Sequence, residues 1–202
     1  AVEKAMALGA TVVTVSDSSG TVLDEDGFST AKLAELMDVK NKHYGRVEDF
    51  AKRIGAKFLP GATPWHVPVD VALPCATQNE LDENDARTLV ANGCIGVSEG
   101  ANMPTTLEGD HVFRAARLLY APGKAANAGG VAVSGLEMSQ NSARISWKED
   151  ELQRLLRDIM DGIHERCLEY GVRSDGYIDY VKGANNAGFK KVADAMLAFG
   201  VV

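Results

Sequence analysis

The sequence is poor in cysteine and has no long apolar run. Its three cysteines, Cys75, Cys94 and Cys167, are an odd number at wide spacings and show no metal-ligand pairing. We interpret them as reduced thiols, and the spacing of the histidines likewise predicts no metal site. No apolar segment approaches the roughly 20 residues that span a bilayer, and no signal-peptide pattern opens the sequence. These features predict a cytoplasmic protein without a membrane partner.

Positive charge is also scarce. The 21 lysines and arginines are outnumbered by 28 aspartates and glutamates, so the formal net charge is -7. Because nucleic-acid binding needs a basic face, this balance predicts that nucleic acid is not a partner. The hydrophobic fraction of 46% and the charged fraction of 24% are typical of globular proteins. The length of 202 residues suffices for one large domain with a helical appendage.

The sequence does not begin with methionine. Residues 1–9 place Val2, Ala5, Met6 and Leu8 on one helical face, and Gly9 is a C-terminal stop signal. Because a chain seldom begins inside a helix, we expect this one to be truncated at its N-terminus.

From residue 10 onward, short apolar segments alternate with helical ones. We expect strands at 10–16, 21–23, 57–59, 69–73, 94–98 and 118–121, and helices at 29–42, 46–54, 82–91 and 105–116. The first segment is β-branched without strict alternation, which predicts a buried parallel strand. The alternation of strands and helices indicates βαβ units and a parallel sheet covered on both faces.

The pattern becomes purely helical from about residue 129. Residues 147–170 carry an apolar stripe at Leu152, Leu155, Leu156, Ile159, Ile163 and Leu168, and residues 186–197 form a second amphipathic helix. We therefore expect a dinucleotide-binding domain at residues 1–128 and a helical segment at residues 129–202.

Polar clusters follow four of the expected strands. They read SDSS at 16–19, CATQN at 75–79, EGAN at 99–102 and PGKAAN at 122–127. Ligands of open parallel sheets bind outside the carboxyl ends of the strands, so these clusters predict a nucleotide site.

Asp17 lies where a dinucleotide fold places the acid that binds the adenine ribose. A solvated turn residue is the alternative. Lys40, His43 and Arg46 form a basic cluster that can meet an NADP 2′-phosphate, and a solvated helix junction is the alternative. The glycine-rich turn of such a fold should precede residue 1. The expected fold is α/β, a Rossmann-like doubly wound parallel sheet that lacks its first strand and glycine-rich turn, followed by C-terminal helices.

Cys75 can be a nucleophile, but no histidine is near it in sequence, and we favour a buried structural thiol. Small residues after Gly129 and Gly130 allow close approach of a ligand or of another helix.

Several long motifs resemble those of hexameric glutamate dehydrogenases. They are PCATQNELD at 74–82, EGANMPTT at 99–106, APGKAANAGGV at 121–131 continuing to SGLEM at 134–138, and GAN at 183–185 with ADAM at 193–196. The likeness extends over essentially the whole chain. It implies an oxidoreductase of nitrogen assimilation that converts L-glutamate to 2-oxoglutarate and ammonia, and the reverse, and that is a homohexamer when full length.

The resemblance also implies roles for single residues. Ala76, Thr77 and Asn102 should line the coenzyme groove, and Asn127 should lie beside the nicotinamide. Ser134 should hold the glutamate side-chain carboxylate, with Val131 packed beside the substrate. The catalytic lysine and aspartate of the family belong to an N-terminal substrate domain outside this chain, toward which residues 129–202 should pack. The fragment alone is therefore expected to be inactive.

The coenzyme is the less settled part of the resemblance. Asp17 argues for NAD, because an acid there suits a free ribose 2′-hydroxyl. Residues 16–20, which include Ser18, resemble the NADP-linked branch, and Lys40 and Arg46 match its basic positions. We favour NADP, with NAD as the alternative.

Two further functions compete with glutamate dehydrogenase. One is an amino-acid dehydrogenase of different specificity, which Ser134 disfavours. The second is a module that binds a dinucleotide without catalysis. A start inside a helix argues against such a module, because a natural one would include its own first strand and glycine-rich turn.

Overall fold

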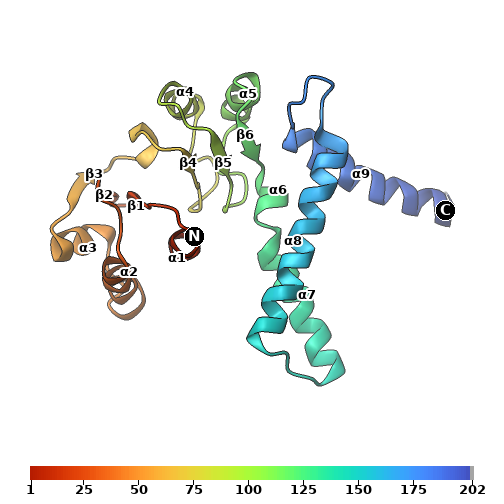
Figure 1. Cartoon of the computed structure of the whole chain (residues 1–202), viewed down its shortest axis with the longest axis horizontal. Helices are drawn as coiled ribbons and strands as arrows, with labels where there is room; N and C mark the ends of the chain where they lie inside the picture. Colours follow the sequence, from red (N-terminus) through yellow and green to blue (C-terminus); the bar gives the residue numbers. More distant parts are fainter. Residues whose placement is uncertain (201–202) are drawn as a thin grey trace. The chain divides into compact units, whose positions relative to one another are not determined.

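The computed structural model describes residues 1–200. The chain forms two compact units, Ala1–Pro68 and Val69–Val202, and each contains a three-stranded sheet (Figure 1). The boundary expected at residue 128 marks a change from strands to helices in the sequence and remains a prediction.

The first unit contains an antiparallel sheet in the order β1-β2-β3. Its elements are α1 (Val2–Ala7), β1 (Thr14–Asp17), β2 (Gly20–Leu23), α2 (Thr30–Met37), a π-helical turn η1 (Asp38–Lys42), α3 (Val47–Ile54), β3 (Lys57–Pro60) and a 3-10 turn η2 (Pro64–His66). Its core consists of Val22, Phe28, Val39, Val47, Phe50 and Ala51. The two phenylalanine rings meet edge to face at 5.6 Å.

The prediction of a buried parallel strand at residues 10–16 is wrong. β1 is shorter, only partly buried, and pairs antiparallel with β2. The reason is the tight turn at Ser18 and Ser19, which pairs Asp17 directly with Gly20. Gly20 has a φ of 144°, and a Cβ there would lie 2.3 Å from the carbonyl oxygen of Leu59, so only glycine fits.

The helix boundaries of this unit follow the signals in the sequence. Ser29 caps α2, because its Oγ accepts a hydrogen bond from the Lys32 amide at 3.2 Å. The expected helix to residue 42 is confirmed, although its last turn is the π-helical η1. α3 ends at Gly55, which has a left-handed φ of 68°.

The second unit contains the parallel sheet that the sequence predicts, in the order β4-β5-β6. The strands are β4 (Val71–Ala72), β5 (Gly96–Ser98) and β6 (Leu119–Ala121), and the helices between them are α4 (Glu83–Ala91) and α5 (Leu107–Ala115). Ala72, Val97 and Tyr120 are in register and buried. These strands are shorter than expected, but their order and direction confirm the βαβ pattern.

Among the described residues, four helices follow β6, which confirms that this part of the chain becomes helical. They are α6 (Gly123–Ala126), α7 (Ala128–Ala143), α8 (Glu149–Gly171) and α9 (Tyr180–Phe199). α8 and α9 approach so closely that a Cβ on Gly183 would lie 2.1 Å from the carbonyl oxygen of Cys167. No helix among residues 1–200 is both long and apolar enough to cross a membrane.

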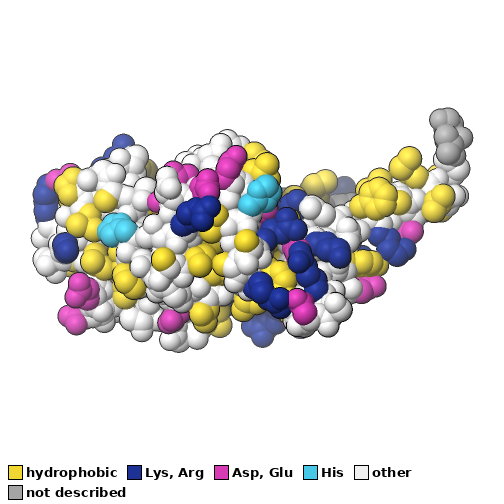
Figure 2. Space-filling model, turned by 90° about the horizontal axis from the view of Figure 1, so that it is seen from above, with side chains coloured by type: hydrophobic (Ala, Val, Ile, Leu, Met, Phe, Trp, Pro, Cys, Tyr) yellow, Lys and Arg dark blue, Asp and Glu magenta, His cyan; other side chains and the backbone are white. Residues whose placement is uncertain are grey.

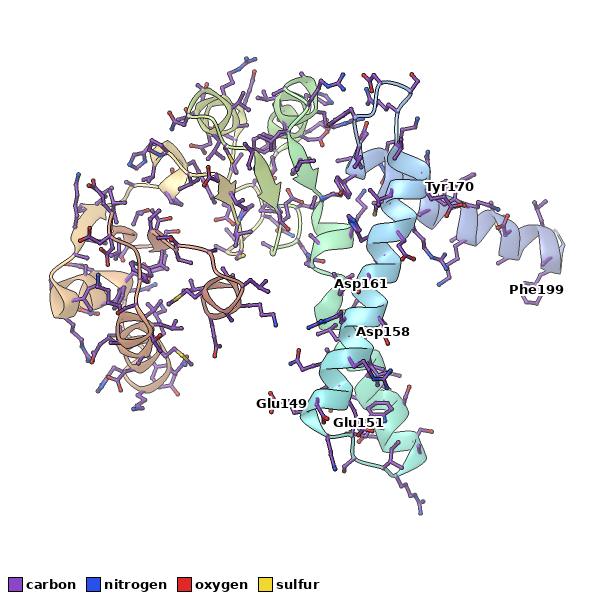
Figure 3. The ribbon with its side chains drawn as sticks, in the orientation of Figure 1. Glu149, Glu151, Asp158, Asp161, Tyr170 and Phe199 are labelled. Carbon is purple, nitrogen blue, oxygen red and sulfur yellow. The ribbon has the colours of Figure 1, made fainter. Side chains whose placement is uncertain are left out.

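The faces of α8 agree with the predicted apolar stripe. The six stripe residues are partly buried, whereas four acidic residues labelled along the helix in Figure 3 are exposed: Glu149, Glu151, Asp158 and Asp161. α9 differs, because apolar side chains on it remain exposed toward the end of the described chain, as Figure 2 shows in yellow. They are Phe189, Val192, Met196, Leu197 and Phe199.

Candidate functional site

The first cluster of predicted residues lies at the end of β1. Asp17 Oδ1 accepts hydrogen bonds from the amide and the hydroxyl of Ser19, at 2.9 and 2.6 Å. Its Oδ2 accepts from Lys40 Nζ at 2.9 Å and from the Val47 amide at 3.0 Å. The carboxylate therefore joins β1 to η1 and to the start of α3.

Arg46 adds a second cationic side chain to this cluster. One of its guanidinium nitrogens donates to Ser18 Oγ at 2.7 Å. Asp17, Ser18, Lys40 and Arg46, which the sequence singles out, are thus in one place. His43, the third member of the expected basic cluster, pairs instead with Asp38 at 3.2 Å.

The charge balance of the cluster is positive. Burial raises the pKa of Asp17, but the hydrogen bonds from Ser19, Lys40 and Val47 outweigh it and hold the pKa well below its ordinary value of 3.8. Among the four side chains of this cluster, one negative charge is therefore set against the two positive charges of Lys40 and Arg46, while the neighbouring Asp49 carboxylate accepts from the Arg46 amide at 2.9 Å. Such a group suits an anionic ligand rather than a neutral one.

The second cluster surrounds a cavity of about 560 Å³ at the carboxyl ends of the parallel strands. It is lined by Ala76, Thr77, Gln78, Gly100, Ala101, Asn102, Asn127 and Val131. Five of these were predicted from the sequence as site residues. Gln78, Gly100 and Ala101 were not singled out, although they belong to the same strand-end motifs.

Asn127 connects two of the loops that form this cavity. Its Nδ2 donates to the carbonyl oxygen of Ala101 at 3.0 Å and to Asn102 Oδ1 at 2.8 Å. Ser134 is exposed on α7, one turn beyond Val131. Within residues 1–200, its hydroxyl makes one long hydrogen bond, of 3.4 Å, to the Gly130 carbonyl. It does not line the cavity but is free to turn toward a ligand.

Glu99 is a buried acid that the sequence does not single out as a site residue. It is 4% exposed, and its two oxygens accept hydrogen bonds of 2.6 Å from the Tyr120 hydroxyl and from the Gly123 amide. Burial and this hydrogen bond raise the pKa of Tyr120 above its ordinary range. The hydrogen bonds of this carboxylate thereby connect the ends of β5 and β6 to the start of α6.

The cavity offers neutral hydrogen-bonding groups rather than a proton-transfer pair. The prediction that Cys75 is a buried structural thiol is wrong in part. Cys75 is exposed, although its sulfur lies against Gly100. Partial burial of this sulfur raises the pKa of the Cys75 thiol, which disfavours a nucleophilic role. Among residues 1–200, no group of three or more His, Cys, Asp or Glu side chains could hold a metal ion.

Residues 1–200 match the model of the glutamate/leucine/phenylalanine/valine dehydrogenase family. The chain is 60% identical over 202 residues to an NADP-specific glutamate dehydrogenase of Salmonella typhimurium. It is 47% identical over 203 residues to an NAD-specific glutamate dehydrogenase of Bacteroides fragilis. Both alignments cover the whole of this chain but only 45% and 46% of the relatives.

The fold is shared with solved structures as well. A glutamate dehydrogenase of Plasmodium falciparum superimposes with a TM-score of 0.94 at 42% identity, and the match covers all of this chain and 44% of that one. This match confirms the expected α/β, Rossmann-like class with C-terminal helices. The chain belongs to the glutamate/leucine/phenylalanine/valine dehydrogenase family, and it spans about 45% of the length of its curated relatives.

Proposed function

We propose that this chain is the coenzyme-binding portion of an NADP-dependent glutamate dehydrogenase, which interconverts L-glutamate with 2-oxoglutarate and ammonia. The observation that carries this proposal is the gathering of predicted residues into two clusters of different chemistry. One is cationic, at the end of β1, and the other is neutral and hollow, at the ends of the parallel strands. The 60% identity to an NADP-specific relative supports it.

Each cluster, taken within its own unit, offers groups of a kind that a nicotinamide dinucleotide requires. Ser18, Lys40 and Arg46 offer donors and positive charge, as a phosphate group requires. Thr77, Asn102 and Asn127 offer hydroxyl and amide groups around a cavity, as a ribose or a carboxamide requires. When bound, the coenzyme supplies the hydride chemistry. The chain itself binds and orients it.

The charge of Asp17 decides how well the first cluster tolerates a 2′-phosphate. An unpaired carboxylate would repel it, but this carboxylate already accepts four hydrogen bonds, one of them from Lys40. Its repulsion is therefore largely offset, and Arg46 and Ser18 remain to bind the phosphate. NAD is the alternative, because a carboxylate in this position also suits a free ribose hydroxyl.

Ser134 favours glutamate among the substrates of the family. A hydroxyl donates to the side-chain carboxylate of glutamate, whereas an apolar substrate would favour an apolar residue. The single long hydrogen bond of Ser134 leaves its proton available for this contact. Val131, 73% exposed on the same helix, can pack against the aliphatic part of the substrate.

The remaining expectations for the whole enzyme are also proposals. The catalytic lysine and aspartate would lie outside this chain, so the chain alone would be inactive. The segment at residues 129–202 would pack toward the substrate domain, which the exposed apolar side chains of α9 support. The assembly would be a homohexamer, and the cytoplasmic location remains a prediction.

A chimera tests the proposal directly. The portion of the Salmonella typhimurium enzyme that precedes the matched region would be joined to this chain, with the Salmonella enzyme as positive control and the isolated chain as negative control. We expect turnover of L-glutamate with NADP well above turnover with NAD. A preference for NAD would make Asp17 the coenzyme selector. Absence of turnover with both coenzymes in a folded chimera would refute the proposed activity.

A further inference from the structure

Glu99 is an acid with an unusual environment. It lies just beyond β5, is 4% exposed, and its two hydrogen-bond donors, the Tyr120 hydroxyl and the Gly123 amide, are both neutral. Within residues 1–200, no ion pair involves Glu99, whereas the buried Asp179 has two arginine partners. The negative charge of Glu99 is therefore held by hydrogen bonds and is not offset by a cation.

A buried carboxylate without a cation is costly to keep. Hydrogen bonds from neutral donors offset only part of the lost hydration, so a positive charge that arrives nearby is favoured. An apolar side chain would fill the same space without this cost. The position therefore suits a ligand that brings a positive charge to the adjoining cavity.

The cavity lies close to this carboxylate. A Cβ added to Gly123 would be 3.3 Å from Glu99 Oε2, 3.2 Å from Asn127 Nδ2 and 2.7 Å from the Ala101 carbonyl oxygen. Glu99 and Asn127 thus flank the same point, and both Ala101 and Asn127 line the cavity. Because Gly123 has no side chain, Glu99 Oε2 can converge with Ala101 and Asn127 around it, which places the buried carboxylate next to two residues of the cavity wall.

We propose that the Glu99 carboxylate makes the site bind the oxidised coenzyme more tightly, relative to the reduced coenzyme, than a neutral residue would. The oxidised nicotinamide ring carries a positive charge and the reduced ring is neutral, so the Glu99 carboxylate favours the oxidised form. This inference rests on the proposed function, since it requires the nicotinamide to occupy the cavity beside Asn127. The attraction between one pair of opposite charges in a partly buried site changes the affinity ratio of the two forms by about tenfold.

Glu99→Gln removes the charge and retains the shape. The glutamine oxygen can accept from the Gly123 amide, and its NH₂ group can donate to the Tyr120 oxygen. The Tyr120 hydroxyl can then turn toward that of Thr105, which lies beside it. Tyr120→Phe is the matched control, because it removes one hydrogen bond and retains the charge. Glu99→Met, also neutral and of similar length, is a second test should the glutamine variant not fold.

The dissociation constants of NADP⁺ and NADPH would be measured for each variant of the chimera, NADPH by its fluorescence and NADP⁺ by displacement. We expect Glu99→Gln and Glu99→Met to raise the ratio of the NADP⁺ constant to the NADPH constant by about tenfold. Tyr120→Phe should leave this ratio unchanged, even where it weakens both complexes.

Equal weakening of both complexes in Glu99→Gln would show that Glu99 only supports the loops, and the inference would be wrong. Unchanged dissociation constants for both forms would overturn it as well. A wild-type chimera that binds neither coenzyme would refute the proposed function itself, a result distinguishable from the first two.

Discussion

Lys40 Nζ lies 2.9 Å from Asp17 Oδ2, and this ion pair connects the acid at the end of β1 to the π-helical turn after α2. The Asp17 side chain is only 14% exposed, so the pair is screened less by solvent than a surface salt bridge. It offsets the charge that would otherwise repel a phosphate at this strand end. Under the proposed function, we therefore expect the coenzyme preference to depend on the pair rather than on Asp17 alone.

Lys40→Met should shift the preference from NADP toward NAD. In this variant, the charge of Asp17 is no longer offset by a lysine and repels a 2′-phosphate. The Asp17 carboxylate stays in place, because the amides of Ser19 and Val47 still donate to it. We expect the dissociation constant of NADPH to rise about tenfold or more and that of NADH to change little. Titration of the chimera with both coenzymes checks this. Equal losses for both would show that Lys40 acts on the fold and not on the phosphate.

Arg46→Ala should weaken NADP binding without a comparable effect on NAD. Its guanidinium contacts only Ser18 among the side chains of the cluster, so the substitution removes a phosphate donor and leaves the Asp17 network intact. We expect an increase of about tenfold in the KM for NADP. Arg53→Ala is the matched control on α3, because Arg53 pairs with Glu35 and Asp38. The same loss in both variants would argue against a specific role.

Asp17 should also contribute pH-dependent stability to the first unit. Its pKa is lowered in the folded state from an ordinary 3.8, so folding favours the carboxylate. The contribution is fully present above about pH 4 and is lost as the pH falls below that value toward the folded pKa. Asp17→Asn should cost about 1–3 kcal/mol at neutral pH.

Urea unfolding of wild type and Asp17→Asn between pH 3 and 8 tests this dependence. The difference between the two proteins should be constant from pH 5 to 8 and shrink below pH 4. A difference that grows as the pH falls would contradict the sign of the pKa shift.

The sequence predicts the elements better than their pairing. Ser29 and Gly55 have local roles as a cap and a stop, so the helices they bound are recognisable without tertiary information. The direction in which β1 pairs is not recognisable in this way, because a β-branched run suits a parallel and an antiparallel partner equally. The turn at Ser18 and Ser19 makes the pairing antiparallel. The steric demand on Gly20 comes from Leu59, which is distant in the sequence.

The candidate site shows the same limit. Thr77, Asn102 and Asn127 are predictable because polar residues at strand ends converge in a parallel sheet. Glu99 belongs to the same motif as Asn102, but its burial depends on Tyr120 and Gly123, which lie on another strand and helix. A charged residue next to a glycine indicates only a loop until those partners are placed around it.

Asp179→Ala should strongly destabilise the second unit. Asp179 is fully buried, caps α9 through the Lys182 amide at 3.0 Å, and pairs with Arg114 at 2.9 Å and with Arg173. Burial raises the pKa of Asp179, but these hydrogen bonds outweigh it and hold the pKa below its ordinary value. Removing one partner of a buried ion pair leaves the other uncompensated, at a cost of about 3–5 kcal/mol.

Asp175→Ala is the control for this prediction. Asp175 pairs with Arg117, but its side chain is 49% exposed, so its loss should change the unfolding midpoint little. Urea unfolding of both variants gives the comparison. Similar midpoints for Asp179→Ala and wild type would mean that the buried network contributes no net stability.

Ser134→Ala should weaken the use of glutamate far more than the binding of coenzyme. The Ser134 hydroxyl is exposed on α7, and its hydrogen bond to the Gly130 carbonyl is long at 3.4 Å, so its loss should not disturb the helix. Loss of a hydrogen bond to a charged carboxylate costs about 1.5–3 kcal/mol, which corresponds to a roughly 10- to 100-fold lower kcat/KM for glutamate. Ser139→Ala, at a similarly exposed position on α7 with a 3.0 Å hydrogen bond to the Gly135 carbonyl, should leave the kinetics unchanged. Unaltered glutamate kinetics in Ser134→Ala would remove this serine from the substrate site, whereas equal losses in both variants would point to the helix rather than to the hydroxyl.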